Sequence, residues 1–524
     1  MSTPITHQST AHTEGEDDHG VKAAEWRRQL IGLFTGLALA LLVWFIFPAD
    51  AVDTVMQSSG AKEGAEYTHG ALRAVAAVVI LMGVWWMTEA IPLAATALLP
   101  LAIFPLAGVG TIKEVGSPYA SATIFLFMGG FLIALALQRW NLHRRMALAV
   151  VNIVGTSPKR LILGFMLATG FLSMWVSNTA TAVVMLPIGT SVLALTADTV
   201  GGMKNQKKFA TALMLGIAYA ASIGSLGTLI GTPPNALLKG YMEESHGIVI
   251  GFGEWMLVGM PLAVIFLVIA WVLLIAIFKP EMDQIPGGKE LIRKEIDALG
   301  PWTGPQVITG IIFLGAAVAW VALPFVLDKS SGYDDAIVGI IAGLLLFIIP
   351  ADAKHGTRLL DWKTANEMPW DVLLLFGGGL SLSAMFNTSG LSLWIGEMAK
   401  GLGSLPTILL VAAVALMVLF LTEITSNTAT AATFLPIMGG VAVGIGLTDS
   451  GDINVMLLTV PVALAATCAF MLPVATPPNA IAYGSGHVRI GDMIKGGIWL
   501  NVIGTVLITL TVYLLAVPVF GLVL

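Results

Sequence analysis

Long apolar segments recur along this chain of 524 residues, and they limit its fold more than any other feature. A helix needs roughly 20 apolar residues to cross the core of a lipid bilayer, and eleven segments come near that length. These predicted spans cover residues 30–48, 72–88, 91–109, 119–137, 209–229, 254–278, 303–323, 335–350, 371–387, 455–472 and 495–520. Only 11% of the residues are charged and 56% are hydrophobic, whereas soluble domains carry about 25% charged residues. The sequence therefore predicts an all-α polytopic membrane protein.

Two further apolar segments, 161–195 and 405–447, are each about twice as long as one span and are interrupted by polar residues near the middle. Backbone that leaves helical geometry at membrane depth must be buried in protein or line a cavity, because lipid cannot satisfy its polar groups. We therefore expect each segment to form a re-entrant helical hairpin that enters and leaves the bilayer by the same face.

Lysine and arginine accumulate in short cytoplasmic loops, so their positions predict the orientation of the chain. With eleven crossings, two hairpins and a cytoplasmic N-terminus, every basic cluster falls on the cytoplasmic side and the C-terminus lies outside the cell membrane. The clusters are Lys22, Arg27 and Arg28; Arg139, Arg144, Arg145, Lys159 and Arg160; Lys204, Lys207 and Lys208; Lys354, Arg358 and Lys363; and Arg489 and Lys495. Residues 1–28 are polar and acidic, which predicts a disordered cytoplasmic tail. A signal peptide cleaved near Ala51 is the alternative, disfavoured by its acidic leader and long apolar region.

Several kinds of function are disfavoured by what the sequence lacks. The single cysteine, Cys468, excludes a disulfide framework and a thiolate metal cluster, and the eight histidines lie outside the most apolar runs. A net charge of −6 without a basic block leaves no footprint for nucleic acid. There is no glycine-lysine loop to hold ATP phosphates. Such a protein draws its energy from an ion gradient or uses none.

The polar interruptions of the two hairpins match each other in sequence. Ser-Asn-Thr-Ala-Thr at 177–181 recurs at 426–430, and Thr-Pro-Pro-Asn at 232–235 recurs at 476–479. Equivalent points of the two copies are separated by five predicted crossings, an odd number, so the copies have opposite orientations. The predicted division is the first helix and repeat 1 in 29–278 (hairpin 161–195, broken helix 209–243), a cytoplasmic linker in 279–302, and repeat 2 in 303–524 (hairpin 405–447, broken helix 455–485).

The repeated motifs supply groups that bind small ions. At each Ser-Asn-Thr one short helix ends and another begins, so free N–H groups, a positive helix end and polar side chains can hold an anion. Proline lacks a donor and clashes with the preceding turn, so each Thr-Pro-Pro-Asn unwinds its span and frees carbonyl oxygens suited to a small cation. Taken singly, such motifs are usually a helix cap or a kink. Their inverted duplication favours a secondary transporter with its site near the membrane midplane.

Three residues within apolar sequence have structural interpretations beside functional ones. Glu89 is expected at the membrane interface or beside a buried donor. Glu423 precedes Asn427 by four residues and could orient the second hairpin tip or take part in ion binding. Trp175 is expected to be a packing or interface anchor.

These motifs, with Trp-Trp-Met-Thr-Glu-Ala-Ile-Pro at 85–92, resemble those of the divalent anion/sodium symporter family over nearly the whole chain. The resemblance implies import of di- or tricarboxylates with sodium. It also implies a homodimer of eleven-helix protomers, in which a scaffold domain holds the dimer and a transport domain moves as an elevator.

The resemblance assigns two groups of residues on this chain. The substrate carboxylates would bind at Ser177, Asn178, Thr179, Thr232, Pro233, Ser426, Asn427, Thr428, Thr476 and Pro477. One sodium ion would be held by Ser173, Ser177, Asn178 and Gly231, and a second by Thr422, Thr425, Asn427 and Ala475, partly through backbone carbonyls.

The family also contains exchangers, which place a basic side chain near the sodium positions. Here no lysine, arginine or histidine occurs within 161–203, 209–238 or 401–486, so a bound dianion needs a cation from solution. This favours sodium symport, and two intact Ser-Asn-Thr motifs favour a C4-dicarboxylate such as succinate, malate or fumarate. A sodium-independent exchanger of the same fold is the main alternative, followed by a passive anion channel. An intramembrane hydrolase is disfavoured, because no constellation of paired acids, histidine-bound metal or serine with a base is apparent.

Overall fold

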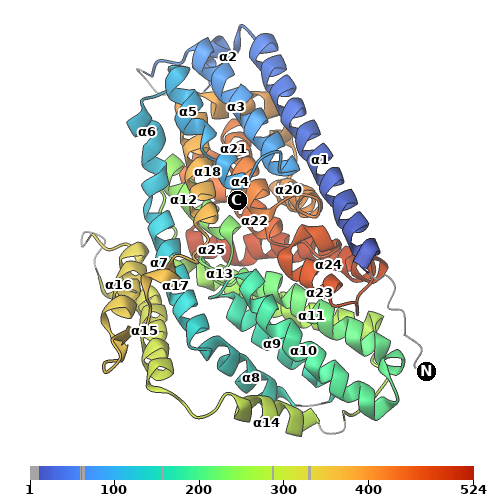
Figure 1. The fold of residues 1–524 in the computed structure, drawn as a ribbon. Coiled ribbons are helices and arrows are strands. Elements are labelled where there is room, and N and C mark those ends of the chain that lie inside the picture. The colour runs from blue at the N-terminus through green and yellow to red at the C-terminus, as the bar shows by residue number, and fades with distance from the viewer. Residues whose placement is uncertain (1–10, 59–60, 62–64, 156, 286–287, 328–331) are drawn as a thin grey trace, which may run out of the picture.

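The computed structural model describes residues 11–58, 61, 65–155, 157–285, 288–327 and 332–524, and it is built almost entirely of helices (Figure 1). The first half contains α1 (Ala11–Ile46), α2 (Ala51–Gln57), α3 (His69–Thr88), α4 (Leu93–Thr96), α5 (Leu99–Leu106), α6 (Ile112–Gly116), α7 (Ala122–Arg139), α8 (Leu142–Val154), α9 (Pro158–Ser173), α10 (Asn178–Val200), α11 (Lys207–Ser225), α12 (Pro233–His246) and α13 (Phe252–Ile277).

The second half begins with α14 and ends with a helix that runs almost to the C-terminus. It contains α14 (Gly288–Ala298), α15 (Gly304–Val326), α16 (Asp335–Ile348), α17 (Trp362–Ala365), α18 (Trp370–Thr388), α19 (Leu391–Ala399), α20 (Thr407–Thr422), α21 (Asn427–Gly444), α22 (Met456–Ala466), α23 (Pro477–Gly484), α24 (Ile490–Thr511) and α25 (Val517–Phe520). The strands β1 (Pro350–Asp352) and β2 (Thr357–Arg358) form one antiparallel pair after α16.

The number of full-length spans is lower than predicted. Among the described residues, nine helical segments are long and apolar enough to cross a membrane, or ten if the bent pair Leu391–Ser404 and Thr407–Thr422 is one span. The predicted spans 91–109, 335–350 and 455–472 fall on shorter apolar helices instead. Their helices stop early for local reasons: Pro350 opens strand β1, and the chain unwinds after Ala466. Eight of the eleven predicted spans therefore contain a helix of membrane length, and the ninth such helix among the described residues is Asn178–Ala197, within the predicted hairpin 161–195.

The N-terminal segment also differs from its prediction. Helix α1 begins at Ala11, so residues 11–28 are helical rather than the disordered tail that their polarity suggested. This stretch contains no proline to stop the helix, although Gly15 and Gly20 lower its helix propensity. Residues 1–10 of the predicted tail lie outside the described residues. Further along, Arg28 of α1 pairs with Glu89 at the end of α3, with 2.9 Å between Nη2 and Oε2.

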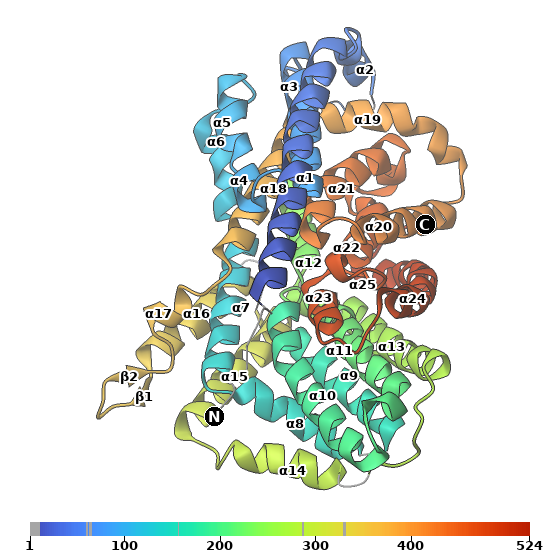
Figure 2. The ribbon, with the colours of Figure 1, turned by 45° about the vertical axis from the view of Figure 1, so that its right-hand side comes forward.

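Each polar interruption separates two helices, as predicted. Helix α9 ends at Ser173 and α10 begins at Asn178, while α20 ends at Thr422 and α21 begins at Asn427. The first pair lies in one half of the molecule and the second pair in the other (Figure 2).

The two Thr-Pro-Pro-Asn motifs also break helices. Helix α11 gives way to α12 across residues 226–232, and α22 gives way to α23 across residues 467–476. In both cases proline occupies the first two positions of the new helix, where its missing N–H costs nothing. We call these two segments the first break and the second break.

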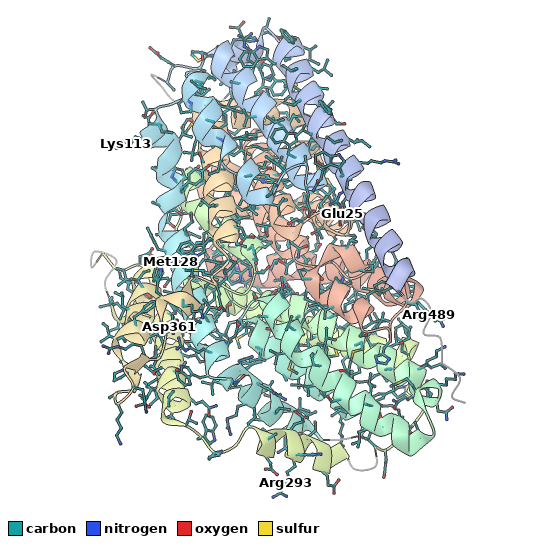
Figure 3. All side chains as sticks on the ribbon, viewed as in Figure 1. Glu25, Lys113, Met128, Arg293, Asp361 and Arg489 are labelled. Atoms are coloured by element: carbon teal, nitrogen blue, oxygen red, sulfur yellow. The ribbon has the colours of Figure 1, made fainter. Side chains whose placement is uncertain are left out.

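The two halves are interleaved at these breaks. Helix α10 packs against α23, and α12 packs against α21, so each hairpin arm contacts the broken helix of the other repeat. At one end of the molecule α14 lies across the bundle within the predicted linker and packs on α8 (Figure 1). Its Arg293 and the Lys113 of α6 lie toward opposite ends (Figure 3).

Candidate binding site at the paired helix breaks

The first hairpin tip gathers three oxygen atoms. The Ser173 Oγ lies 2.7 Å from Asn178 Oδ1 and 2.6 Å from the carbonyl oxygen of Ala221 at the end of α11. A serine hydroxyl has one proton, so it can donate to only one of these two acceptors at a time. The cluster therefore keeps oxygen lone pairs that no proton of these three groups satisfies.

The second hairpin tip repeats this cluster atom for atom. The Thr422 Oγ1 lies 2.7 Å from Asn427 Oδ1 and 2.9 Å from the carbonyl oxygen of Ala466 at the end of α22. Neutral oxygens that outnumber their protons are what a hard cation such as sodium requires, so the residues present fit sodium in each half. Ala221 and Ala466 were not predicted, because a backbone carbonyl leaves no mark in the sequence.

Each break is held by the asparagine that ends its Thr-Pro-Pro-Asn motif. The Asn235 Nδ2 donates to the carbonyl of Thr228 at 2.9 Å, with longer contacts to those of Ser225 and Leu226 at 3.4 Å. The Asn479 Nδ2 donates to the carbonyls of the equivalent positions, Ala469 and Leu472, at 3.1 Å each. Both asparagines were missed as site residues, although their duplication was a signal for them.

The two breaks meet each other. The Thr232 Oγ1 lies 3.3 Å from the Thr467 Oγ1, which joins the first break to the second. Thr476 caps α23 by accepting the N–H of Asn479 at 3.3 Å. Among the described residues no hydrogen bond joins Asn178 directly to Asn427, so the hairpin tips are connected through the breaks.

The other predicted residues lie at the starts of four helices. Helices α10, α12, α21 and α23 all begin at a repeated motif, and each presents free N–H groups and the positive end of its dipole there. Ser177 caps α10 by accepting the N–H of Ala180 at 3.3 Å. The remaining predicted positions are Thr179 in the first turn of α10, Pro233 in that of α12, Ser426 and Thr428 at the start of α21, and Pro477 in the first turn of α23.

The remaining predicted cation ligands offer backbone groups. The Gly231 N–H bonds the Thr228 carbonyl, and the Ala475 N–H bonds the equivalent Leu472 carbonyl, at 3.4 and 3.3 Å. The Thr425 hydroxyl is engaged with the Leu421 carbonyl at 2.9 Å and with Thr430, so its own carbonyl is the group left to bind a cation.

Glu423 orients the second break. Its side chain is 3% exposed and accepts the backbone N–H groups of Phe470, Met471 and Leu472 at 2.7, 2.9 and 3.2 Å. The Asn501 Nδ2 of α24 donates to the same carboxylate at 2.8 Å. Four donors satisfy an ionised carboxylate, so Glu423 holds the unwound backbone from inside the protein. The sequence had left open whether it orients the tip or binds an ion.

The interval 209–238, which contains no basic residue, is followed by a buried lysine. Lys239 lies one turn beyond Asn235 on α12, its side chain is fully buried, and its Nζ is 3.6 Å from the Glu243 Oε2. Its nearest carboxylate is thus on its own helix.

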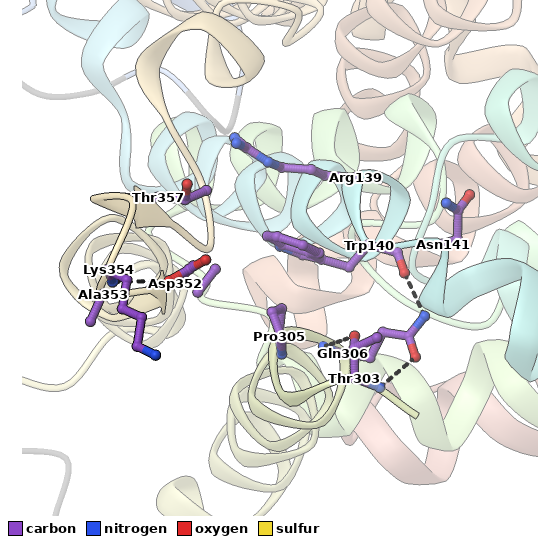
Figure 4. A pocket seen from close by; sticks show the side chains of 11 residues that line it. Arg139, Trp140, Asn141, Thr303, Pro305, Gln306, Asp352, Ala353, Lys354 and Thr357 are labelled. Carbon is purple, nitrogen blue, oxygen red and sulfur yellow. Dashed lines mark hydrogen bonds between the residues drawn. The ribbon is translucent and has the colours of Figure 1, made fainter. Parts of the chain in front are cut away.

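A second kind of metal site is not apparent among the described residues, which contain no group of three or more histidine, cysteine, aspartate or glutamate side chains placed to hold a metal ion. A hollow of about 770 Å³ lies elsewhere, between the end of α7, the start of α15 and the β1–β2 pair (Figure 4). Arg139 at its rim pairs with Asp361 at 2.7 Å, and the Thr364 N–H together with Arg139 lowers the pKa of Asp361 to about 2. None of the repeated motifs lines this hollow.

Interleaved repeats, paired broken helices and membrane-length spans define a polytopic membrane transporter rather than an enzyme. The chain belongs to the family described as "Sodium:sulfate symporter transmembrane region", whose model matches residues 67–522. This confirms the family that the motifs predicted.

Curated relatives of similar length are close in sequence. The sodium-dependent dicarboxylate transporter SdcS of Staphylococcus saprophyticus is 42% identical over 501 residues, which is 94% of this chain and 92% of the relative. SdcS of Staphylococcus aureus is 43% identical over 455 residues, covering 85% of this chain and 86% of the relative.

Solved structures support the fold alone. The YdaH transporter of Alcanivorax borkumensis matches with a TM-score of 0.51 and 15% identity, over 85% of this chain and 98% of that one. MtrF of Neisseria gonorrhoeae, described as one of a class of antimetabolite efflux pumps, matches with a TM-score of 0.53 and 10% identity, over 94% of this chain and 96% of that one.

Proposed function

We propose that this protein imports C4-dicarboxylates such as succinate, malate and fumarate across the cell membrane together with sodium. The observation that carries the proposal is the matched oxygen cluster at each hairpin tip, Ser173, Asn178 and Ala221 in one half and Thr422, Asn427 and Ala466 in the other. The names of the SdcS relatives agree with this substrate and this ion.

The substrate is bound by neutral donors in this mechanism. Its two carboxylates face the starts of the four motif helices, where the N–H groups and the side chains of Asn178 and Asn427 donate hydrogen bonds. Neutral donors leave most of the dianion's charge uncompensated. The lysine of α12, Lys239, forms an ion pair with Glu243. Two or more sodium ions at the oxygen clusters supply the missing positive charge, so substrate and sodium bind together.

Transport follows an elevator movement in a homodimer. The hairpins and broken helices move as one transport domain against a scaffold that includes 72–109 and 303–350, with the N-terminus cytoplasmic and the C-terminus outside. Because the repeats are inverted, the re-entrant hairpins open on opposite faces, and the site is exposed to one side at a time. The Trp175 ring at the first tip packs edge-on against Phe313 of α15, with centroids 5.1 Å apart, which supplies a contact between the two bodies.

The test of the function is uptake of radiolabelled succinate into proteoliposomes with an imposed sodium gradient. Uptake is expected with sodium and not with potassium or choline at the same ionic strength. Equal uptake in sodium-free buffer by vesicles preloaded with dicarboxylate would identify an exchanger, and sodium-independent flux without preloading would identify a passive channel.

The test of the movement uses Trp175→Cys and Phe313→Cys together in a Cys468→Ser background, with the two thiols joined by a short thiol-reactive linker. If the hairpin moves against α15, the linker stops uptake, and a cleavable version restores it on reduction. Undiminished uptake with the linkage complete would instead support local gating of a fixed site.

A further inference from the structure

Asn235 and Asn479, which hold the two breaks and are called the staple asparagines below, share an unexplained feature. Both side chains are fully buried, and both use their amide nitrogen on the carbonyls of their own break. The Oδ1 atom of each is buried and has no hydrogen-bond partner among the described residues. The unpartnered atom is therefore the same one in each repeat.

The orientation of these amides is set by their surroundings. Only the NH₂ group can donate to a carbonyl oxygen, and each amide faces at least two such carbonyls, so a flipped amide would place oxygen against oxygen. A buried acceptor without a partner costs about 1–3 kcal/mol. Two copies of one duplication that both carry this cost indicate that a ligand supplies the partner.

The two asparagine side chains are anchored through their Nδ2 atoms on the same backbone stretches that supply the carbonyls of the oxygen clusters. Asn235 contacts the Ser225 carbonyl, four residues after Ala221, the carbonyl that Ser173 contacts. Four residues of helix rise about 6 Å, so the staple and the cluster are anchored one turn apart. In the second half Asn479 contacts the Ala469 carbonyl, three residues after Ala466, the carbonyl that Thr422 contacts.

We infer that Asn235 and Asn479 are cation ligands in addition to the hairpin-tip residues, and that their Oδ1 atoms each complete the oxygen shell of a sodium ion bound at their break. The inference rests on the proposed sodium coupling and deepens it. A neutral amide oxygen is a hard ligand that suits a monovalent cation. The same side chain holds the break with its nitrogen and binds the ion with its oxygen, so the break takes its binding shape before the ion arrives.

The experiment separates the two roles of the amide by comparing aspartate and alanine variants. Asn235→Asp and Asn479→Asp keep an oxygen ligand and lose the N–H donors, whereas Asn235→Ala and Asn479→Ala lose both. The readout is the sodium concentration that gives half of the thermal stabilisation of the purified protein, titrated against a constant total of sodium and potassium. The control is Asn454→Ala, which removes another buried asparagine whose Oδ1 already accepts the Val523 N–H at 2.9 Å.

For a ligand role, the half-saturating sodium concentration rises about tenfold or more in the alanine variants, since about 1.4 kcal/mol of lost affinity is tenfold. It rises at least about threefold less in the aspartate variants, which lose the preformed shape of the break but keep an oxygen ligand, and it is unchanged in the control. Equal shifts in the aspartate and alanine variants, or no shift in either, would overturn the inference and leave a purely structural staple. If a variant at one position does not fold, the pair at the other position decides. Wild-type protein that is stabilised equally by sodium and potassium would overturn the proposed function itself.

Discussion

The two halves of the site share the oxygen atoms of their clusters and differ in what supports them. The first tip is covered: Trp175 packs on Phe252 and Phe313, and Ile230 of the first break lies against Gly130 of α7. The equivalent residues of the second half are open, since Ile424 is 67% exposed and Val474 is 81% exposed.

The second break is held by a buried carboxylate, whereas the first tip is held by packing of aromatic and aliphatic side chains. Glu423 binds three backbone N–H groups of the second break, whereas Met174 stands at the equivalent position of the first tip. The comparison teaches that a duplicated site keeps its oxygen clusters, while packing in one copy and a buried charge in the other can perform the same structural task.

The strongest test of the shared part is removal of the tip asparagines. Asn178→Ala and Asn427→Ala are each expected to lower sodium-driven succinate uptake by about 100-fold, because a hydrogen bond to a charged substrate and a cation ligand together are worth on the order of 3 kcal/mol. Thermal melting of the purified variants controls for folding. Near-normal uptake by either variant would contradict the site assignment, and a large effect in only one would show that the halves are unequal in binding.

The carboxylate support predicts a difference between the halves. Glu423→Gln keeps one acceptor oxygen but loses its charge, so the second break loosens and uptake falls by roughly 30-fold, from about 2 kcal/mol of lost charge-assisted hydrogen bonding. Met174→Leu, a change at the equivalent position of the first half, is expected to stay within about threefold of wild type, because a buried Met tolerates a hydrophobic replacement of similar volume. Similar losses in both would remove the distinction between the halves. Glu89→Gln serves as a control for loss of a half-exposed acid.

The glycine at the first break predicts a smaller asymmetry. A Cβ on Gly231 would collide with the Ser225 carbonyl oxygen, whereas the equivalent Ala475 already carries one. Gly231→Ala is expected to cost roughly 1–3 kcal/mol of stability and to lower uptake about tenfold, because backbone must shift to accept the methyl group. The reverse change, Ala475→Gly, should cost no more than about 1 kcal/mol. Denaturation midpoints and uptake of the two variants measure this, and equal effects would show that the breaks are equally tight.

The covered tip predicts the smallest effect on uptake. Trp175→Ala is expected to lower stability by about 2 kcal/mol and uptake a few-fold, because the ring loses its stacking on Phe252 and its edge-on contact with Phe313. Ile424→Ala, the equivalent exposed position, should change stability by less than about 0.5 kcal/mol. A larger loss for Ile424→Ala would indicate that another surface covers the second tip in the membrane.

Much of the fold could be predicted from the properties of residues that are close together in the sequence. Apolar runs placed most membrane-length helices. Proline in Thr-Pro-Pro-Asn placed the end of each break, since a missing N–H acts on its own helix, but not the start of the unwinding at residues 226 and 467. The lengths of three helices were predicted less well. The apolar segments that contain α5, α16 and α22 form helices shorter than a membrane span, because the chain turns or unwinds beyond them. The tail shows the opposite error: polarity suggested disorder, yet a stretch without proline continues α1 upstream.

The sequence by itself determined that two copies of each polar motif stand at helix ends, because both the motifs and the helix ends are set by residues close together in the chain. Only the tertiary structure decided which oxygens complete each cluster. The Ala221 carbonyl reaches Ser173 across 48 residues, and the N–H of Phe470 reaches Glu423 across 47. Backbone groups look alike at every position of a sequence, so their role depends on which helices pack together, and that is settled by the fold.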